Sequence, residues 1–133
     1  MNNVGEWKKL ILDYDQEGQP TFLDAVPVNT VEKGKKNDSG KVDLSLLPPL
    51  SIIGIGRVLG MGAAKYDRFN WRGGIKYSRL LGAALRHIFA YIGGEDIDPE
   101  SGISHIHHAA CNLVFLGQFI EEGRTELDDR YKK

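Results

Sequence analysis

The chain has 133 residues, with 17 basic and 18 acidic side chains and a formal net charge of −1 at neutral pH. This length suits one globular domain and is short for two. The near-neutral charge argues against the broad basic surface that binding to a nucleic-acid backbone requires. No run approaches the roughly 20 apolar residues that span a bilayer, so we expect a soluble protein that binds neither nucleic acid nor membrane. One cysteine, Cys111, excludes an internal disulfide and fits a reducing cytoplasm.

Residues 1–40 are predicted to form an extension and a linker before the main domain. Apolar residues alternate on both sides of a Gly- and Pro-containing turn between Trp7 and Phe22, which favours a small β-hairpin. A helix is the alternative for the first part, because four apolar residues also fit a helical spacing: Trp7, Leu10, Ile11 and Tyr14. The polar, turn-rich stretch from Val31 to Gly40 is typical of a linker.

A first helix is expected at Pro48 and Pro49, because prolines are tolerated in the first turn of a helix. Apolar residues follow at helical spacing: Leu50, Ile53, Val58, Leu59 and Ala63. The same stretch holds four glycines: Gly54, Gly56, Gly60 and Gly62. Since each glycine lowers helix stability by roughly 1 kcal/mol relative to alanine, we expect a neighbouring helix to approach this backbone closely.

A second helix is expected from Ser78, acting as its N-cap, to about Ile92, where two glycines end it. At about 100° per residue, its apolar side chains share one face: Leu81, Ala84, Leu85, Ile88 and Ile92. Arg79 and Arg86 lie on the opposite face, and His87 lies at the border.

A third helix is expected from about Ile103 to Glu122. His105, His108 and Asn112 fall on one narrow strip, and His107 points elsewhere, toward the surface. The strip continues toward the C-terminus with apolar residues: Phe115, Leu116 and Phe119. We therefore expect the two strip histidines and the asparagine at the buried end of a seam between helices. The charged tail, residues 123–133, is expected to fray.

Four carboxylates lie within six residues between the second and third helices: Glu95, Asp96, Asp98 and Glu100. A divalent cation relieves the repulsion within such a group, and oxygen ligands favour magnesium or manganese over zinc. Basic residues upstream suit the remaining charge of a polyphosphate: Lys65, Arg72 and Arg86. The pattern thus favours phosphate chemistry. The structural alternatives are a solvated turn at Asp98-Pro99, a satisfied polar cluster between helices, and a surface loop anchored by aromatic side chains.

The chain also resembles a known family, through an ordered series of short motifs. These are Lys41-Val-Asp43, Leu47-Pro-Pro49, Gly62-Ala-Ala-Lys65-Tyr66, Asn70-Trp71-Arg72, Gly74, Arg86-His87, Gly94-Glu95, Asp98-Pro-Glu100-Ser-Gly102, His105, His108-Ala109 and Asn112. The series resembles the phage dATP/dGTP diphosphohydrolase N-terminal domain family, of the MazZ type, over about Lys41 to Phe119. The resemblance implies a mainly α, MazG-like helical bundle over residues 41–122, with a charged tail at residues 123–133.

The same resemblance implies a hydrolase that cuts purine deoxynucleoside triphosphates to monophosphate and pyrophosphate, using Mg²⁺ or Mn²⁺, in phage control of nucleotide pools in the host cytoplasm. A homo-oligomer is implied as well. The other functions left open are a non-catalytic nucleotide-binding or protein-interaction module, and a structural metal site that pins two helices together.

Site roles follow from the matched motifs. The catalytic, metal-proximal residues would be Glu95, Asp98 and Glu100, with His87, His105 and His108 as further candidate metal ligands. The substrate-binding residues would be Lys65, Tyr66, Asn70, Trp71, Arg72, Arg86 and Asn112, with Tyr66 or Trp71 stacking on the purine. One feature departs from the MazG-like pattern, because the third helix offers histidines and an asparagine where carboxylates are usual. Either the acidic turn alone holds the metal or the coordination is mixed.

Overall fold

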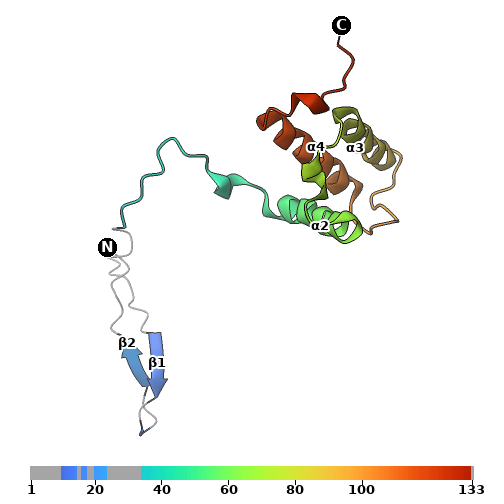
Figure 1. Cartoon of the computed structure of the whole chain (residues 1–133). Helices are drawn as coiled ribbons and strands as arrows, with labels where there is room; N and C mark the ends of the chain where they lie inside the picture. The colour runs from blue at the N-terminus through green and yellow to red at the C-terminus, as the bar shows by residue number, and fades with distance from the viewer. Residues whose placement is uncertain (1–9, 15, 18–19, 24–33, 133) are drawn as a thin grey trace, which may run out of the picture. The chain divides into compact units, whose positions relative to one another are not determined.

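The computed structural model of the chain describes residues 10–14, 16–17, 20–23 and 34–132. The chain divides into two units, residues 1–43 and residues 44–133. In the first unit, β1 (Leu10–Tyr14) pairs antiparallel with β2 (Pro20–Leu23) (Figure 1). The predicted hairpin is confirmed for these strands, whereas Trp7 lies outside the described residues. Residues 34–43 contain neither helix nor strand.

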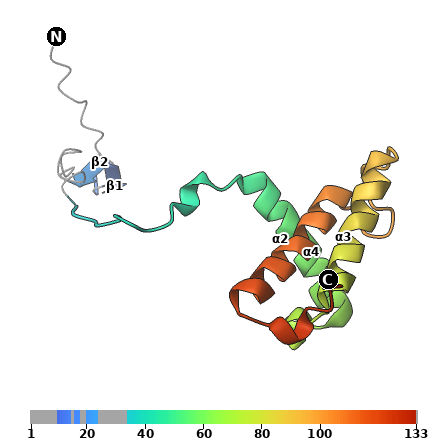
Figure 2. The ribbon, with the colours of Figure 1, turned by 90° about the horizontal axis from the view of Figure 1, so that it is seen from above.

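The second unit is a small bundle of three helices: α2 (Pro49–Tyr66), α3 (Tyr77–Ile92) and α4 (His105–Glu121). Short 3₁₀ turns flank them: η1 (Leu44–Leu46), η2 (Asn70–Gly73) and η3 (Thr125–Leu127). Helix α4 packs against both α2 and α3, and it lies between them when the molecule is turned (Figure 2). The mainly α fold is confirmed. No helix in the described part of the chain has the length and apolar character to cross a membrane.

The ends of the helices follow from local sequence. Pro49 occupies the first turn of α2, and Gly94, with a φ of 95°, follows the end of α3. Ser104 caps α4, where its side-chain oxygen accepts a hydrogen bond from the Ile106 amide. The prediction that Ser78 caps α3 is wrong, because that helix already begins at Tyr77.

The core is centred on Phe119 of α4, which is 0% exposed. It packs with three other buried residues, Tyr77, Leu80 and Leu127. Trp71, Ile75, Phe115 and Leu116 are partly buried against this cluster. The predicted apolar seam along α4 is therefore confirmed, and residues of α3, η2 and η3 complete it.

The C-terminal segment does not fray as expected. Gly123, with a φ of 68°, turns the chain back, and Leu127 of η3 enters the core. The start of α3 then holds the segment through hydrogen bonds: Tyr77 Oη donates to the Arg124 carbonyl (3.4 Å), and Lys76 Nζ donates to the Glu126 carbonyl (2.8 Å). Ser78 donates through both its amide and its hydroxyl to Asp129 (2.9 and 2.6 Å). One apolar residue inside the charged tail thus anchors it.

The face of α3 that packs inward matches the predicted one only in part. Of the predicted residues, Ala84 is buried and Leu81 and Ile88 are half-buried, whereas Leu85 and Ile92 are exposed. The other buried residues of the helix are Tyr77 and Leu80. The helix carries two neighbouring apolar stripes, and α4 packs on one of them. The apolar stripe predicted for α2 is also largely exposed, since only Gly54 and Val58 of that helix are buried.

The predicted close approach to the glycine-rich helix occurs at one glycine. A Cβ atom added to Gly54 would lie 2.4 Å from Cε1 of His107, so the imidazole of α4 packs directly on the backbone of α2. His107 is half-buried here rather than on the surface, which corrects its predicted place. At Gly56, Gly60 and Gly62, nothing in the described structure lies within 4 Å of an added Cβ.

Replacement of these glycines tests the contact. Gly56→Ala should raise the free energy of unfolding by up to about 1 kcal/mol, because alanine favours the helix. Gly54→Ala should lose this gain, since its methyl group displaces the His107 ring. The two variants should therefore differ by about 1 kcal/mol or more, measured by urea denaturation. In a double-mutant cycle, His107→Ala should restore the gain of Gly54→Ala. Equal stabilisation by both alanines would contradict the packing.

Candidate active site

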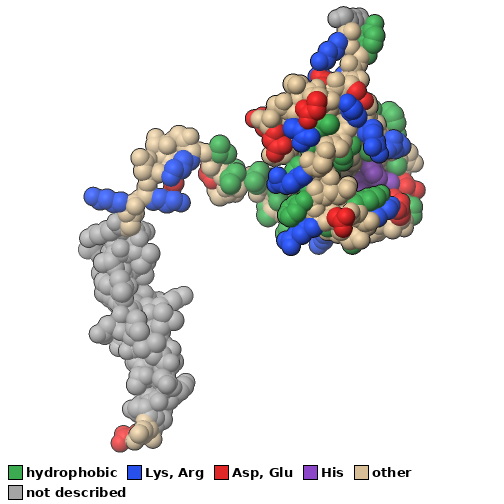
Figure 3. Space-filling model, in the orientation of Figure 1, with side chains coloured by type: hydrophobic (Ala, Val, Ile, Leu, Met, Phe, Trp, Pro, Cys, Tyr) green, Lys and Arg blue, Asp and Glu red, His purple; other side chains and the backbone are tan. Residues whose placement is uncertain are grey.

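A polar cluster lies where the end of α3, the acidic turn and the start of α4 meet. Figure 3 shows histidine at the surface of the helical unit beside acidic side chains. His105 Nε2 lies 2.7 Å from Glu95 Oε1, and His105 Nδ1 lies 2.8 Å from His87 Nδ1. The carboxylate only accepts hydrogen bonds, so His105 donates to it through Nε2–H. Between the two Nδ1 atoms, the tautomers of the rings decide which nitrogen donates and which accepts. The three side chains form a relay from Glu95 through His105 to His87.

A second relay runs beside the first. Ser101 Oγ lies 2.7 Å from Asp98 Oδ2 and 2.7 Å from His108 Nε2. Because the carboxylate accepts, the serine hydroxyl donates to Asp98 and His108 donates to the serine. The His108 ring stacks on the His87 ring, with centroids 4.5 Å apart and planes 13° apart. The two relays therefore meet at His87, and His105 and His108 are buried as the strip predicted.

The acidic turn is a closed, hydrogen-bonded loop. The Asp98 amide donates to the Ile103 carbonyl (2.9 Å), and the His105 amide donates to the Asp96 carbonyl (3.1 Å). Gly102, with a φ of 70°, allows the chain to reverse. The Asp98 carboxylate takes part in the hydrogen bonds of this loop, since it also accepts a hydrogen bond from the Ser101 amide (3.2 Å). The loop thus fixes Asp98 and leaves the other carboxylates toward solvent.

Burial sets the protonation of the cluster. Loss of hydration lowers the pKa of His108, and the same effect, with the neighbouring His108 and His105 rings, lowers the pKa of His87. The hydrogen bond from Ser101 lowers the pKa of Asp98. At neutral pH the site therefore holds neutral His87 and His108 beside an ionised Asp98.

These shifts predict how stability depends on pH. A histidine whose pKa is lower in the folded state binds fewer protons than the unfolded chain once pH falls toward its ordinary value of about 6.5. The free energy of unfolding of the metal-free protein should therefore fall between pH 7.5 and 5.5, by at most about 1.4 kcal/mol per pH unit for each histidine. Protonation of Asp98 affects the free energy of unfolding only below about pH 4. Urea denaturation in EDTA measures this, and constant stability across that range would contradict the burial of neutral imidazoles.

The predicted metal ligands are not arranged as a cage. Glu95 bonds His105, Asp98 bonds Ser101, and Glu100 pairs with Lys65 at 3.1 Å. Among the described residues, no three His, Cys, Asp or Glu side chains converge in a way that would hold a metal ion. The donors in this conformation do not fit a closed metal site, and the ligand assignments stay predictions.

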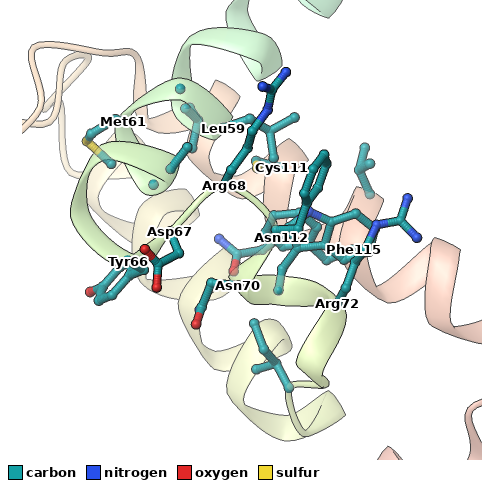
Figure 4. Close-up of a pocket in the computed structure, with 18 of the residues that line it drawn as sticks. Leu59, Met61, Tyr66, Asp67, Arg68, Asn70, Arg72, Cys111, Asn112 and Phe115 are labelled. Atoms are coloured by element: carbon teal, nitrogen blue, oxygen red, sulfur yellow. The ribbon is translucent and has the colours of Figure 1, made fainter.

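A cavity of about 670 Å³ lies between α2, η2 and α4 (Figure 4). Five predicted substrate-binding residues line it: Tyr66, Asn70, Trp71, Arg72 and Asn112. Asn112 is also the link to the histidines, because its Nδ2 donates to the His108 carbonyl (2.9 Å). One face of Trp71 is already occupied, since its ring stacks on Phe115 with centroids 4.9 Å apart.

Two predicted phosphate-binding residues lie outside this cavity. Lys65 reaches from the end of α2 to Glu100, so the acidic turn already has one basic partner. Arg86 lines a second hollow of about 330 Å³, which it shares with Asn112. Asn112 is thus the one predicted residue common to both hollows.

Residues 31–130 match the family model described as "dATP/dGTP diphosphohydrolase, N-terminal". The chain belongs to this family. The match extends past both ends of the span that the motifs had marked, and it includes the C-terminal segment that packs against α3. A "dATP/dGTP diphosphohydrolase" of Salmonella phage PMBT28 is 40% identical over 98 residues, covering 74% of this chain and 33% of the relative. The chain therefore spans about a third of that protein's length. No solved structure matches it.

The sequence patterns did not predict two residues that the structure places at the candidate site or the cavity. Ser101 links Asp98 to His108, and its position three residues after an aspartate was the available signal. Asp67, which follows α2 and lines the cavity, has a φ of 111° and a ψ of 151°. This conformation is nearly restricted to glycine and costs on the order of 1–3 kcal/mol for other residues. No sequence signal marked Asp67.

Proposed function

We propose that this family member hydrolyses dATP and dGTP to the monophosphate and pyrophosphate, as part of phage control of nucleotide pools in the host cytoplasm. The name of the phage relative supports the reaction and the substrates. The observation that carries the proposal is the relay of Glu95, His105 and His87, which lies beside acidic and basic side chains and connects through His108 and Asn112 to a cavity of nucleotide size.

Glu95 is the proposed general base. Its side chain is 55% exposed, so a water molecule can reach it, and His105 holds one of its carboxylate oxygens in place. Glu95 takes a proton from the water as the water oxygen forms a bond to the α-phosphorus. The bond from the α-phosphorus to the bridging oxygen breaks, and pyrophosphate leaves with those electrons. His105 and His87 position the carboxylate and do not contact the phosphates.

Basic side chains bind the leaving pyrophosphate in this proposal. Lys65 lies at the acidic turn, where Glu100 raises its pKa through a hydrogen bond and keeps it charged. Arg72 and Arg86 lie at the two hollows that share Asn112. Magnesium is usually held by one or two carboxylates together with substrate phosphates, so the exposed Glu95 and Glu100 would hold Mg²⁺ or Mn²⁺ together with the phosphate oxygens of a bound nucleotide. When bound, such an ion neutralises charge on the phosphate oxygens.

A homo-oligomer is part of the same proposal. One face of α3 exposes three apolar side chains in the single chain: Leu85, Phe89 and Ile92. Apolar patches of this kind favour association. Size-exclusion chromatography with light scattering should give a mass above 14.8 kDa, and Phe89→Glu should shift it toward the monomer. A monomeric wild-type chain would contradict this part.

Pyrophosphate release tests the reaction. The full chain is incubated with dGTP, dATP, dCTP or dTTP, each with Mg²⁺ or Mn²⁺, and pyrophosphate is measured by a coupled assay. Release from the two purine nucleotides, and little from the pyrimidine nucleotides, is expected. No release from dGTP or dATP under either metal, with an active control enzyme in the same assay, would overturn the proposal.

The second candidate is a nucleotide-binding module without activity of its own. It is favoured by the coverage, because the chain spans only about a third of the phage relative. Calorimetry with dGTP and Mg²⁺ separates the two functions. Binding without pyrophosphate release supports the module, whereas release supports the hydrolase. A structural metal site would instead show a Tm lowered by EDTA and unaffected by nucleotide.

A further inference from the structure

The cavity between α2, η2 and α4 has the character of a site for a flat, mostly apolar group. Much of its wall is aliphatic or aromatic, including Leu59, Met61, Val114 and Phe115. Its two arginines lie over the same aromatic ring: the Arg68 and Arg72 guanidinium groups are each 5.6 Å from the centroid of Phe69. A triphosphate needs convergent charge, so this wall suits a heterocyclic base better.

Polar groups gather at one end of this cavity. Asp67, Asn70 and Asn112 all line it, and Figure 4 shows the Asn112 amide on the side of Asn70 and Asp67. One hydrogen of the Asn112 amide is used on the His108 carbonyl, which leaves its oxygen to accept. In the described part of the chain, the Asp67 carboxylate has no hydrogen bond or ion pair, and Asp67 is exposed. This end therefore offers acceptors to a ligand.

The backbone at Asp67 gives a second, independent indication. Its φ of 111° lies where glycine is the favoured residue, at the point where α2 ends. Asp67 retains a carboxylate in this unfavourable conformation, at the polar end of the cavity. A strained residue that the surrounding structure holds in place is a common feature of ligand sites.

We propose that this cavity is a purine pocket and that Asp67 recognises guanine through the hydrogens on N1 and the 2-amino group. Guanine presents these two donors side by side, and a carboxylate accepts both in a bidentate, charge-assisted pair. Adenine enters the same cavity without this pair, and a pyrimidine leaves part of the apolar wall uncovered. The inference rests on the proposed function for the identity of the ligand, and it adds the place of the base and the residue that reads it.

Phosphate-free nucleosides test the pocket apart from any hydrolysis. Deoxyguanosine and deoxyinosine differ only by the 2-amino group. We expect the wild-type chain to bind deoxyguanosine about tenfold more tightly than deoxyinosine, because one hydrogen bond to a charged group is lost. The titration is followed by NMR on the indole N–H of Trp71, which lines the cavity, with a Trp7→Phe variant to assign the signal.

Variants of Asp67 give the decisive comparison. Asp67→Asn should reduce the deoxyguanosine-to-deoxyinosine ratio to about twofold or less, because the amide offers one acceptor where the carboxylate offers two. Asp67→Gly should lose the same selectivity while raising the Tm by several degrees, because glycine removes the backbone strain. Unchanged selectivity in both variants would overturn the role of Asp67, and so would a wild-type chain without preference.

Filling the cavity tests its place in the structure. Gly62 lines the cavity and has room for a side chain, and Gly56, on the same helix, has equal room but lies outside it. Gly62→Leu should weaken deoxyguanosine binding by tenfold or more, whereas the matched control Gly56→Leu should leave it unchanged. Equal binding by the two leucine variants would place the base elsewhere.

Pyrophosphate release from dGTP by the same proteins separates the two proposals. The wild-type chain could hydrolyse dGTP while its nucleoside binding does not change with substitutions at Asp67 and Gly62. That result would refute the pocket and leave the proposed function intact. Asp67-dependent nucleoside binding by a chain that releases no pyrophosphate would support the pocket and refute the hydrolysis.

Discussion

Phe119→Ala should cause the largest loss of stability in the helical unit. Phe119 is 0% exposed and packs with Tyr77, Leu80 and Leu127, so its removal leaves a cavity where α3, α4 and the C-terminal segment meet. Losses of this kind lower the free energy of unfolding by about 3–5 kcal/mol. For a unit of this size, the Tm should fall by roughly 15 °C or more.

Thermal denaturation followed by circular dichroism at 222 nm measures this loss. Tyr91→Ala is the matched control, because Tyr91 lies on α3 and is 44% exposed. It should change the Tm by a few degrees at most. If Phe119→Ala and Tyr91→Ala had similar Tm values, the core would not be centred where the structure has it.

Glu95→Gln should cause the largest loss of activity. The amide keeps the size of the side chain and a hydrogen-bond acceptor for His105, but it no longer accepts a proton from water. General-base catalysis contributes about 10²–10⁴-fold, so kcat for dGTP should fall at least about 100-fold. The Tm should stay within about 2 °C of the wild-type value, because the Glu95 side chain is 55% exposed and its hydrogen bond with His105 can be kept by the amide.

Glu121→Gln is the matched control for this variant, since Glu121 is an exposed residue of the same charge at the far end of α4. Its kcat should equal that of the wild-type chain. A loss of less than about threefold in Glu95→Gln would move the general base to another residue. Asp98 is a poorer test, because its carboxylate holds the acidic turn and Asp98→Ala should lower stability as well as activity.

Much of the helical fold follows from local patterns. The spacing of His105, His108, Phe115 and Phe119 along one helix predicts which side of α4 is buried, because neighbours three or four residues apart share a face in any α-helix. The prolines at the start of α2, the serine before α4 and the glycines after α3 mark the helix ends for equally local reasons. These predictions needed no knowledge of what each helix packs against.

The wrong predictions all concern partners distant in sequence. Ser78 has the chemistry of an N-cap, but Asp129, 51 residues later, takes its hydrogen bonds. His107 points away from the histidine strip, yet it is covered by Gly54 of another helix. On α3, the helical periodicity fits two adjacent apolar stripes equally well as the buried face. The position of α4 decides which residues are buried. A helical pattern specifies the faces of a helix without specifying the neighbour of each face.

The sequence alone determined that this chain is mainly helical, that its histidines and carboxylates gather near one turn, and to which family its motifs are similar. The tertiary structure decided how those groups are paired: Glu95 with His105, Asp98 with Ser101 and His108, and Lys65 with Glu100. It also revealed the cavity and the strained Asp67 at its edge. Helix periodicity depends on neighbours within one turn, whereas a hydrogen bond or a cavity wall depends on atoms from several elements, which only the packing of those elements brings together.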